Sequence, residues 1–268
     1  MASEVTAGSQ TLDRALCALI RIGESGSRGL SLAECSASLG YSKATTHRIL
    51  RTLAARGFLR VDLERGLYTL GAANLRLGMT FLEQLDIRTE ALPVLRELGE
   101  RTEETVHLGV LDGSDVIYIE KIESTHAVRM FSRIGRTMPA YSTGIGKAIL
   151  SHLRPDELDQ ALPEKLEPRT PATITVRAAL VRHLADVRRR GYSTDNVENE
   201  DGIRCVGAPV FDHSGHVCAG ISVAGPATRV TADRFPELGD LVREAALSVS
   251  QRIGYVPEAV PAGLSETG

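Results

Sequence analysis

Cysteine, long apolar runs and metal-binding patterns are all scarce in this chain. Its four cysteines, Cys17, Cys35, Cys205 and Cys218, lie far apart and form no CxxC pair, which argues against a disulfide framework or a zinc knuckle. No apolar run approaches the roughly 18 residues of a membrane helix. The N-terminus also lacks the basic and apolar regions of a signal peptide. The histidines form no HxxxH or HExxH pair. We therefore expect a cytoplasmic protein with no membrane segment, metal site or cofactor.

The charge of the chain is unevenly distributed. The 268 residues, 43% apolar and 24% charged, suit two modest globular domains. The net charge is −3, yet through Leu70 nine basic residues face six acidic ones, so this segment carries +3 and the remainder −6. A basic head on an acidic body is typical of a phosphate-binding module joined to a part that does not bind phosphate.

The N-terminal segment predicts three helices and a tight turn. The first helix has Ser9 as its N-cap, ends at Gly26 and Gly29, and carries one apolar stripe of Leu12, Ala15, Leu16, Leu19 and Ile20. Ser31 and Glu34 form a capping-box pattern that opens a short second helix. Gly40 then supplies the turn of a helix-turn-helix. Ser42 caps a third helix that runs to about Arg56.

The third helix carries the chemistry of DNA recognition. Thr46, Ile49, Leu50 and Leu53 fall at i, i+3, i+4 and i+7 and share the buried face. The opposite face then carries Ala44, His47, Arg48 and Arg51. Two arginines, one hydrogen-bonding ring and one small apolar group suit base edges in the major groove. The alternative is a basic helix face that is only solvated.

A hairpin follows the three helices. Residues 58–61 and 67–70 read as short strands, and residues 62–66 turn between them. The sequence therefore predicts a winged helix-turn-helix over residues 9–70, which binds double-stranded DNA. The residues expected at the DNA are Ser42, Lys43, Ala44, Thr45, His47, Arg48, Arg51, Arg60 and Arg65.

Residues 71–86 predict a linker helix that is apolar on more than one side. Its apolar residues include Leu75, Leu77, Met79, Phe81, Leu82 and Leu85. A neighbour must therefore cover the helix. That neighbour is either a partner subunit, which we favour, or the rest of the same chain.

The remaining residues, 87–256, predict a second domain. Strand patterns occur at residues 106–111, 116–119, 128–131, 205–211 and 217–224. Helices are expected near residues 144–153, 176–190 and 232–253. Adjacent hairpins and grouped helices favour an antiparallel sheet domain flanked by helices, and hence an α+β class.

Several stretches resemble the IclR family of bacterial regulators. The similarity runs from Gly8 to Gly254. The matching stretches include Ser31–Glu34, Thr46–Leu53, Glu104–Leu108, Thr143–Ala148, Arg190–Tyr192, Gly202–Asp212 and Ile221–Pro226. The resemblance implies a GAF-like effector domain, homodimers joined through the N-terminal region, and often a dimer of dimers. It also implies control of a catabolic operon, most often by repression, through a small-molecule effector that binds the C-terminal domain.

The resemblance also places an effector pocket. By position, its residues are Met130, Met138, Gly144, Ile145, Asp195, Ile203, Cys205, Ser222 and Ala224. Gly144 and Ile145 open a helix, whose free amides suit a carboxylate. Members of the family that bind very small keto acids tend to have a smaller residue in place of Ile145 and a serine in place of Ala224. We therefore expect a more apolar organic or aromatic acid, or a related amide or hydrazide.

Two catalytic interpretations are set aside. The run 144–147 resembles half of a phosphate-binding loop, but Tyr141 and Ala148 stand where that loop needs glycine and a hydroxyl residue. Cys205 with Asp195 suggests a hydrolytic enzyme or a purely ligand-binding module. However, Cys205 begins an apolar strand, where a cysteine is usually a buried small hydrophobe. We expect no catalytic residue.

Overall fold

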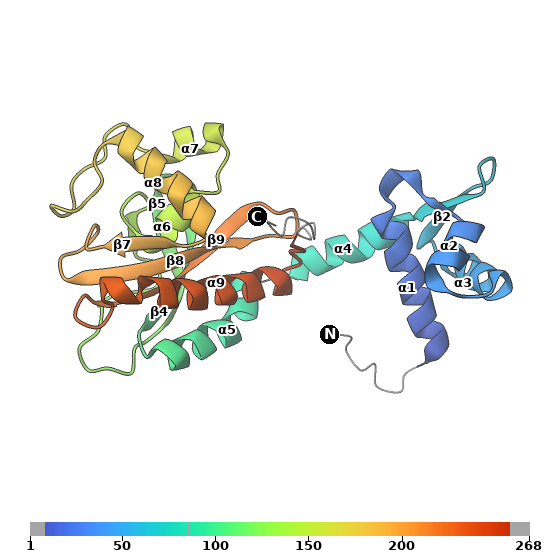
Figure 1. Ribbon diagram of the computed structural model, residues 1–268, viewed down its shortest axis with the longest axis horizontal. Coiled ribbons are helices and arrows are strands. Elements are labelled where there is room, and N and C mark those ends of the chain that lie inside the picture. Colours follow the sequence, from blue (N-terminus) through green and yellow to red (C-terminus); the bar gives the residue numbers. More distant parts are fainter. Residues whose placement is uncertain (1–8, 85, 258–268) are drawn as a thin grey trace, which may run out of the picture. The chain divides into compact units, whose positions relative to one another are not determined.

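The computed structural model describes residues 9–84 and 86–257 (Figure 1). The chain divides between Leu85 and Asp86 into two compact units, each with its own core, and each unit is described separately. Within the described ranges, no helix combines the length and the apolar character that a membrane crossing requires.

The N-terminal unit is a winged helix-turn-helix followed by one further helix. Its elements are α1 (Gln10–Glu24), a 3-10 turn (Gly26–Arg28), β1 (Leu30–Ser31), α2 (Leu32–Leu39), α3 (Lys43–Ala55), β2 (Leu59–Asp62), β3 (Leu67–Leu70) and α4 (Ala72–Gln84). The strands form an antiparallel sheet in the order β1-β3-β2. The hairpin of β2 and β3 is the predicted wing, whereas the two-residue β1 carried too little sequence to be predicted.

The predicted caps of α2 and α3 are present. Ser31 accepts a hydrogen bond from the amide of Glu34, and the Glu34 carboxylate accepts one from the amide of Ser31. Gly40 ends α2 in the left-handed conformation, with φ 69°, which glycine adopts without steric cost. Ser42 then caps α3 by accepting from the amide of Thr45. These local signals fix the angle between the two helices.

The first helix ends where its glycines predict. Its last residue is Glu24, Ser25 is the C-cap, and Gly26 follows at φ 59°, the left-handed conformation common just after a helix. Ser9 occupies the predicted N-cap but makes no side-chain hydrogen bond. The predicted apolar stripe is only partly buried. Leu12, Leu16 and Ile20 are 60%, 51% and 62% exposed, while Ala18 and Ile22 fill the core. The apolar residues of α1 span a wider arc than the core of this unit covers.

The side chains of α4 are partly exposed within this unit. Leu75 and Leu77 are 68% and 59% exposed. Leu85 and the side chains of Met79, Phe81 and Leu82, which the sequence assigns to the linker helix, lie outside the described residues.

The C-terminal unit is built on a six-stranded antiparallel sheet in the order β6-β5-β4-β9-β8-β7. Its strands are β4 (Thr105–Asp112), β5 (Asp115–Ile122), β6 (Thr137–Pro139), β7 (Ser193–Asn196), β8 (Ile203–Phe211) and β9 (Val217–Pro226). Its helices are α5 (Ile87–Thr102), α6 (Gly144–Leu150), α7 (Pro155–Ala161), α8 (Arg177–Arg190) and α9 (Phe235–Arg252), the last preceded by a 3-10 turn (Ala232–Arg234).

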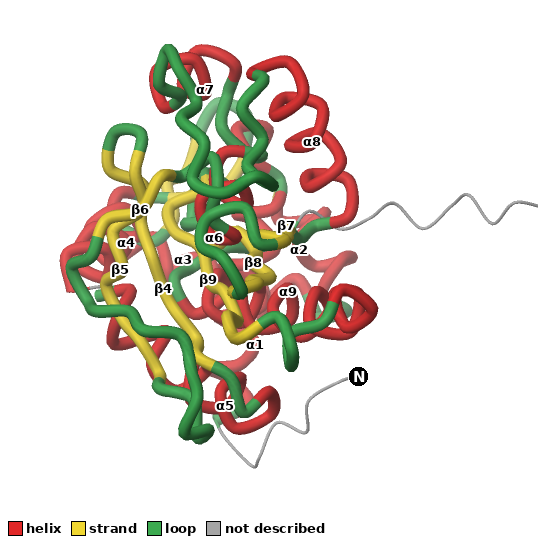
Figure 2. Tube along the Cα trace, turned by 90° about the vertical axis from the view of Figure 1, so that its left-hand side faces the viewer, coloured by secondary structure: helices red, strands yellow, loops and turns green. Residues whose placement is uncertain are grey.

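Helices cover both faces of this sheet (Figures 1 and 2). The long helices α5 and α9 pack against each other and against β4 and β8, whereas α6 lies on β7, β8 and β9 and contacts α8. One face of the sheet is apolar and fully buried, because alternate residues of a strand project to the same face. On β4 and β9 these residues are Val106, Leu108, Ile221 and Val223. The architecture is the predicted α+β arrangement.

The predicted strand at residues 128–131 is wrong. This segment belongs to an irregular loop between β5 and β6, in which Met130 is buried while Val128 and Phe131 are 71% and 67% exposed. The place beside β5 is taken by β6, whose Met138 pairs with Val116. The short strand β7, which carries Asp195, was not predicted.

Candidate DNA-binding surface and effector pocket

The candidate DNA-binding surface lies on the exposed face of α3. Thr46, Ile49 and Leu50 are buried in the core of the unit, as predicted. Of the nine residues predicted at the DNA, Thr45 is half-buried and the other eight are exposed. The exposed members are Ser42, Lys43, Ala44, His47, Arg48, Arg51, Arg60 and Arg65. The structure thus gathers the predicted residues of α3 on one solvent-facing side of the helix.

The cations of this surface are available to a ligand. Within the described ranges, Lys43, Arg48 and Arg51 make no ion pair, unlike Arg21 on α1, whose guanidinium meets Glu24 at 2.7 Å. An arginine with no carboxylate partner keeps its planar set of donors for a phosphate or the edge of a guanine.

The wing carries two further arginines. Arg60 lies on β2, opposite Thr69 of β3. Arg65 lies in the turn, where the Asp62 carboxylate accepts hydrogen bonds from the amides of Glu64 and Arg65 at 3.0 and 3.1 Å. These bonds hold the turn in shape. The Arg65 guanidinium lies 4.0 Å from the Asp62 carboxylate, which is long for an ion pair, and the Arg65 side chain is 78% exposed. This pair is therefore a weak surface contact.

The candidate effector pocket is assembled by strand register. Two rows of residues cross neighbouring strands of the large sheet. The first row contains Asp195, Cys205, Ala224 and Thr105, on β7, β8, β9 and β4. The second contains Gly207, Ser222 and His107. Residues opposite one another on paired strands project from the same face. Four predicted pocket residues therefore share a face with three that were not predicted, namely Thr105, His107 and Gly207.

The apolar residues of the predicted pocket separate into two groups. Met130, Cys205 and Ala224 form one buried cluster, with Ile203 packed against it. Met138 and Ile145 instead belong to the neighbouring core, together with Tyr118 and residues of α8. Ile145 is 1% exposed and lies against Gly109 and Gly220 of β4 and β9. Ile145 is thus part of the packing between α6 and the sheet.

The first turn of α6 lies directly on the sheet. A Cβ added at Gly144 would be 3.1 Å from the Cβ of Cys205, and one added at Gly207 would be 2.7 Å from the Gly144 carbonyl group. Gly207 therefore needs glycine for this approach, whereas a side chain at Gly144 would require Cys205 to move by a few tenths of an ångström. Thr143 caps the helix by accepting from the amide of Gly146 at 3.1 Å. The start of α6 is therefore held beside Cys205.

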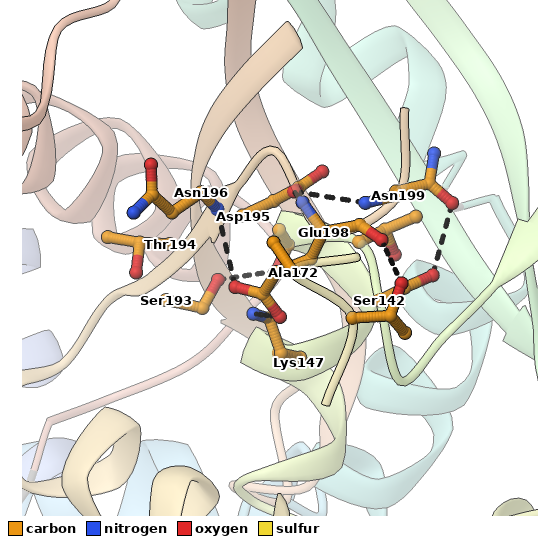
Figure 3. A network of polar contacts seen from close by, with 12 residues as sticks. Ser142, Lys147, Ala172, Ser193, Thr194, Asp195, Asn196, Glu198 and Asn199 are labelled. Carbon is orange, nitrogen blue, oxygen red and sulfur yellow. Dashed lines mark hydrogen bonds and ion pairs between the residues drawn. The ribbon is translucent and has the colours of Figure 1, made fainter. Parts of the chain in front are cut away.

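Asp195 belongs to a buried polar network (Figure 3). Its carboxylate accepts hydrogen bonds from the amides of Glu198 and Asn199 at 2.7 and 3.3 Å. Beside it, the fully buried Lys147 ammonium group meets the Glu198 carboxylate at 2.5 Å. Burial raises the pKa of Asp195 to about 7, against the opposing effect of Lys147. Between Asp195 and Glu198, Val197 has φ 62°, a conformation that a β-branched residue rarely adopts.

Sequence reasoning missed several polar residues of the pocket region. Thr105 and His107 are 0% and 1% exposed and stand at alternate positions of β4. The alternation along this strand was a usable signal, because it places both residues on the face opposite Val106. Lys147 and Glu198 gave no comparable signal, since nothing local to either residue indicates that they meet.

The Cys205 thiol is not set up as a nucleophile. Burial, followed by the negative charge of Asp195, raises the pKa of Cys205 well above its ordinary value. A thiol in this state remains protonated, whereas the reactive form is the thiolate. Among the residues that the structure describes, no cluster of histidine, cysteine and carboxylate side chains has the geometry of a metal site.

Two family models match the chain. The IclR helix-turn-helix domain matches residues 11–63, and the model described as bacterial transcriptional regulator IclR C-terminal matches residues 79–251. The HTH-type transcriptional regulator BhcR of Paracoccus denitrificans is 40% identical over 251 residues, which cover 93% of this chain and 89% of BhcR. The HTH-type transcriptional regulator XynR of Escherichia coli is 38% identical over 247 residues, or 92% of this chain and 98% of XynR.

A solved structure shares the fold. The crystal structure of the Agobacterium tumefaciens repressor BlcR matches with a TM-score of 0.83 and 30% identity, over 94% of this chain and all of the matched BlcR chain. These relatives are transcriptional regulators, so neither the sequence comparisons nor the state of Cys205 supports an enzyme.

Proposed function

We propose that this chain, which belongs to the IclR family of bacterial transcriptional regulators, is a cytoplasmic repressor of a catabolic operon. It binds a palindromic operator through α3. It also binds a small organic or aromatic acid, or a related amide or hydrazide, on the sheet of the C-terminal unit. Effector binding changes operator affinity through the linker helix.

The observation that carries the DNA-binding part is the free basic face of α3. Lys43, Arg48 and Arg51 are exposed and have no carboxylate partner within the described ranges. Arg48 and Arg51 suit bidentate contacts to guanine, and Lys43 in the first turn suits a phosphate. The wing arginines, Arg60 and Arg65, would follow the backbone of the same site.

The exposed apolar residues of α1 support a homodimer. Leu12, Leu16 and Ile20 recur every four residues and are each more than half exposed. A stripe of this kind is costly in water unless a second surface covers it. One recognition helix contacts few base pairs, so a dimer with half-sites about one helical turn apart, or a multiple of it, is needed for specificity. Two such dimers can then associate into a tetramer, which is the dimer of dimers that the family resemblance implies.

The effector-binding part rests on the polar groups gathered beside the start of α6. We place the acid or amide head at the Gly144 and Ile145 amides and the Ser222 hydroxyl, because helix amides stabilise negative charge. The apolar part of the effector would lie on Met130, Ile203 and Ala224, which already form an apolar cluster with Cys205.

The test of this function is a gel shift with DNA from upstream of the chain's own gene. We expect specific binding whose affinity falls steeply with salt, since each neutralised phosphate releases counterions. A thermal-shift screen of acids, esters, amides and phenols would then identify ligands, because a ligand of the native state raises its melting temperature. Equal affinity for the upstream DNA and for unrelated DNA of the same length would contradict the proposal.

A further inference from the structure

Two buried side chains of β4 have polar atoms without a hydrogen-bond partner. The Thr105 hydroxyl and the His107 Nδ1 atom make no hydrogen bond within the described part of the chain. The two residues are 0% and 1% exposed. Burying such an atom unpaired costs free energy, so each one calls for an explanation.

Both residues face the candidate effector pocket. Thr105 pairs with Ala224 and His107 with Ser222 across the β4–β9 ladder, and Ala224 in turn pairs with Cys205. Cross-strand partners project from one face with Cβ atoms about 5 Å apart. Ala224 offers the Thr105 hydroxyl no polar group. The unpaired atoms thus lie on the side of the sheet where the effector is proposed to bind.

The His107 ring is fixed in place. Its Nε2 atom is 2.7 Å from the Ser132 hydroxyl, and the ring stacks on Tyr118 with centroids 4.5 Å apart. Burial, followed by the nearby Lys121 charge, lowers the pKa of His107 to about 3, so the ring is neutral near pH 7. A neutral ring leaves Nδ1 as either one donor or one acceptor. With the Thr105 hydroxyl, it can serve an uncharged polar group.

We propose that Thr105 and His107 form a second polar subsite of the effector pocket, which binds an uncharged hydroxyl, carbonyl or amide group of the effector. The inference rests on the proposed function, in which the acid head lies near Gly144 and Ser222. Ser222 of β9 lies one strand away from Thr105 and His107, and Gly144 lies against β8, two strands away. Neighbouring strands are about 4.8 Å apart. The effector is then an acid with a second polar group roughly 5–10 Å from its carboxylate.

The first test needs no ligand. Thr105→Val keeps the shape of the side chain and removes the unpaired hydroxyl, so the melting temperature of the full chain should stay the same or rise by about 2 °C. Thr102→Val is the matched control, because the Thr102 hydroxyl donates to the Leu98 carbonyl at 2.8 Å and its loss should not stabilise the chain. A clear fall in the melting temperature of Thr105→Val would mean that the hydroxyl is bonded within the protein, which overturns the subsite.

The second test uses pairs of acids that differ by one polar group. Calorimetry would compare hexanoate with ω-hydroxyhexanoate, and phenylpropionate with its ring-hydroxylated forms. The wild-type chain should bind the hydroxylated member at least about tenfold more tightly. In Thr105→Val and His107→Phe that ratio should fall to about one, because the parent acid lacks the group that the subsite binds.

The outcomes separate the two proposals. A wild-type ratio near one, or a ratio that both variants retain, overturns the subsite while leaving an acid-binding regulator in place. If no acid of the panel binds the wild-type chain, the proposed effector class fails and the subsite fails with it.

Discussion

The two units place their functional residues in opposite ways. The N-terminal unit presents an exposed face of a single helix, in which Lys43, His47 and Arg48 lie within six residues of chain. The C-terminal unit gathers its candidate site from four strands and one short helix, and Thr105, Cys205 and Ser222 are all buried. One surface can change without disturbing the fold beneath it, whereas the other is part of the core.

This difference predicts how mutations separate function from stability. Exposed side chains of α3 contribute little to the core, so their removal should affect DNA binding alone. A buried residue near the pocket takes part in packing and in ligand contact together. The predictions below test that separation, from the largest expected effect to the smallest.

The largest expected effect is the destabilisation caused by Gly146→Ala. A methyl group at this position would collide with the Ala140 carbonyl oxygen, which belongs to the backbone and cannot turn away. We expect a loss of about 3 kcal/mol in unfolding free energy, as for severe overpacking of a core. Chemical denaturation followed by circular dichroism would measure it.

Gly78→Ala is the matched control on α4. Apart from the glycine's own neighbours and the adjacent backbone of α4, no atom of the described residues lies within 4 Å of the added methyl group. Alanine also favours a helix over glycine, so a gain of about 0.5–1 kcal/mol is expected. Similar losses in both variants would show that close approach to the sheet is not what requires glycine at position 146.

Loss of a groove-facing arginine should weaken operator binding without weakening the fold. We expect Arg48→Ala or Arg51→Ala to cost about 1–3 kcal/mol on the operator if the side chain contacts a guanine. The melting temperature should not change, because both side chains are exposed and make no ion pair within the described ranges. Gel shifts and thermal melts on the same preparations would test both statements.

Two further variants sharpen this result. Lys43→Ala should weaken binding to all sequences alike and flatten the salt dependence, because a phosphate contact carries no sequence information. Arg21→Ala, on α1 and paired with Glu24, should leave operator affinity unchanged. If all the α3 variants bound like wild type, the assignment of α3 to the groove would fail.

The same comparison explains what the sequence could predict. The exposure pattern of α3 followed from helical periodicity, and the caps at Ser31, Gly40 and Ser42 followed from local chemistry. The pairing of Lys147 with Glu198 depends on segments 51 residues apart, which no local pattern reports. The apolar stripe of α1 followed from periodicity too, but periodicity does not report which part of an apolar face the core covers.

Ser222→Ala should weaken effector binding and leave operator binding intact. The hydroxyl is buried on the pocket face of β9, and loss of one hydrogen bond to an acid head should cost about 1–2 kcal/mol. Calorimetry with a confirmed effector and a ligand-free gel shift would measure the two quantities. Ser214→Ala, in the exposed turn before β9, is the control. Unchanged effector affinity in Ser222→Ala would move the acid head elsewhere.

The last prediction is a pH dependence that originates at Asp195, and its effect on effector affinity is the smallest of the predicted effects on binding. Burial raises the pKa of its carboxyl group to about 7, whereas an unfolded aspartate has a pKa of about 3.9. Between these values the folded chain keeps a proton that the unfolded chain has lost. The contribution of Asp195 to stability therefore falls as pH rises from about 4 to about 7, and then levels off. Asp195→Asn still accepts from the Glu198 and Asn199 amides but does not ionise, so its stability relative to wild type should increase across that window.

Above about pH 7 the Asp195 charge should also repel an acidic effector, and we expect wild-type affinity for the effector to fall severalfold between about pH 6 and about pH 8. Denaturation and calorimetry at both pH values would test this, and parallel profiles for wild type and Asp195→Asn would show that another group is responsible.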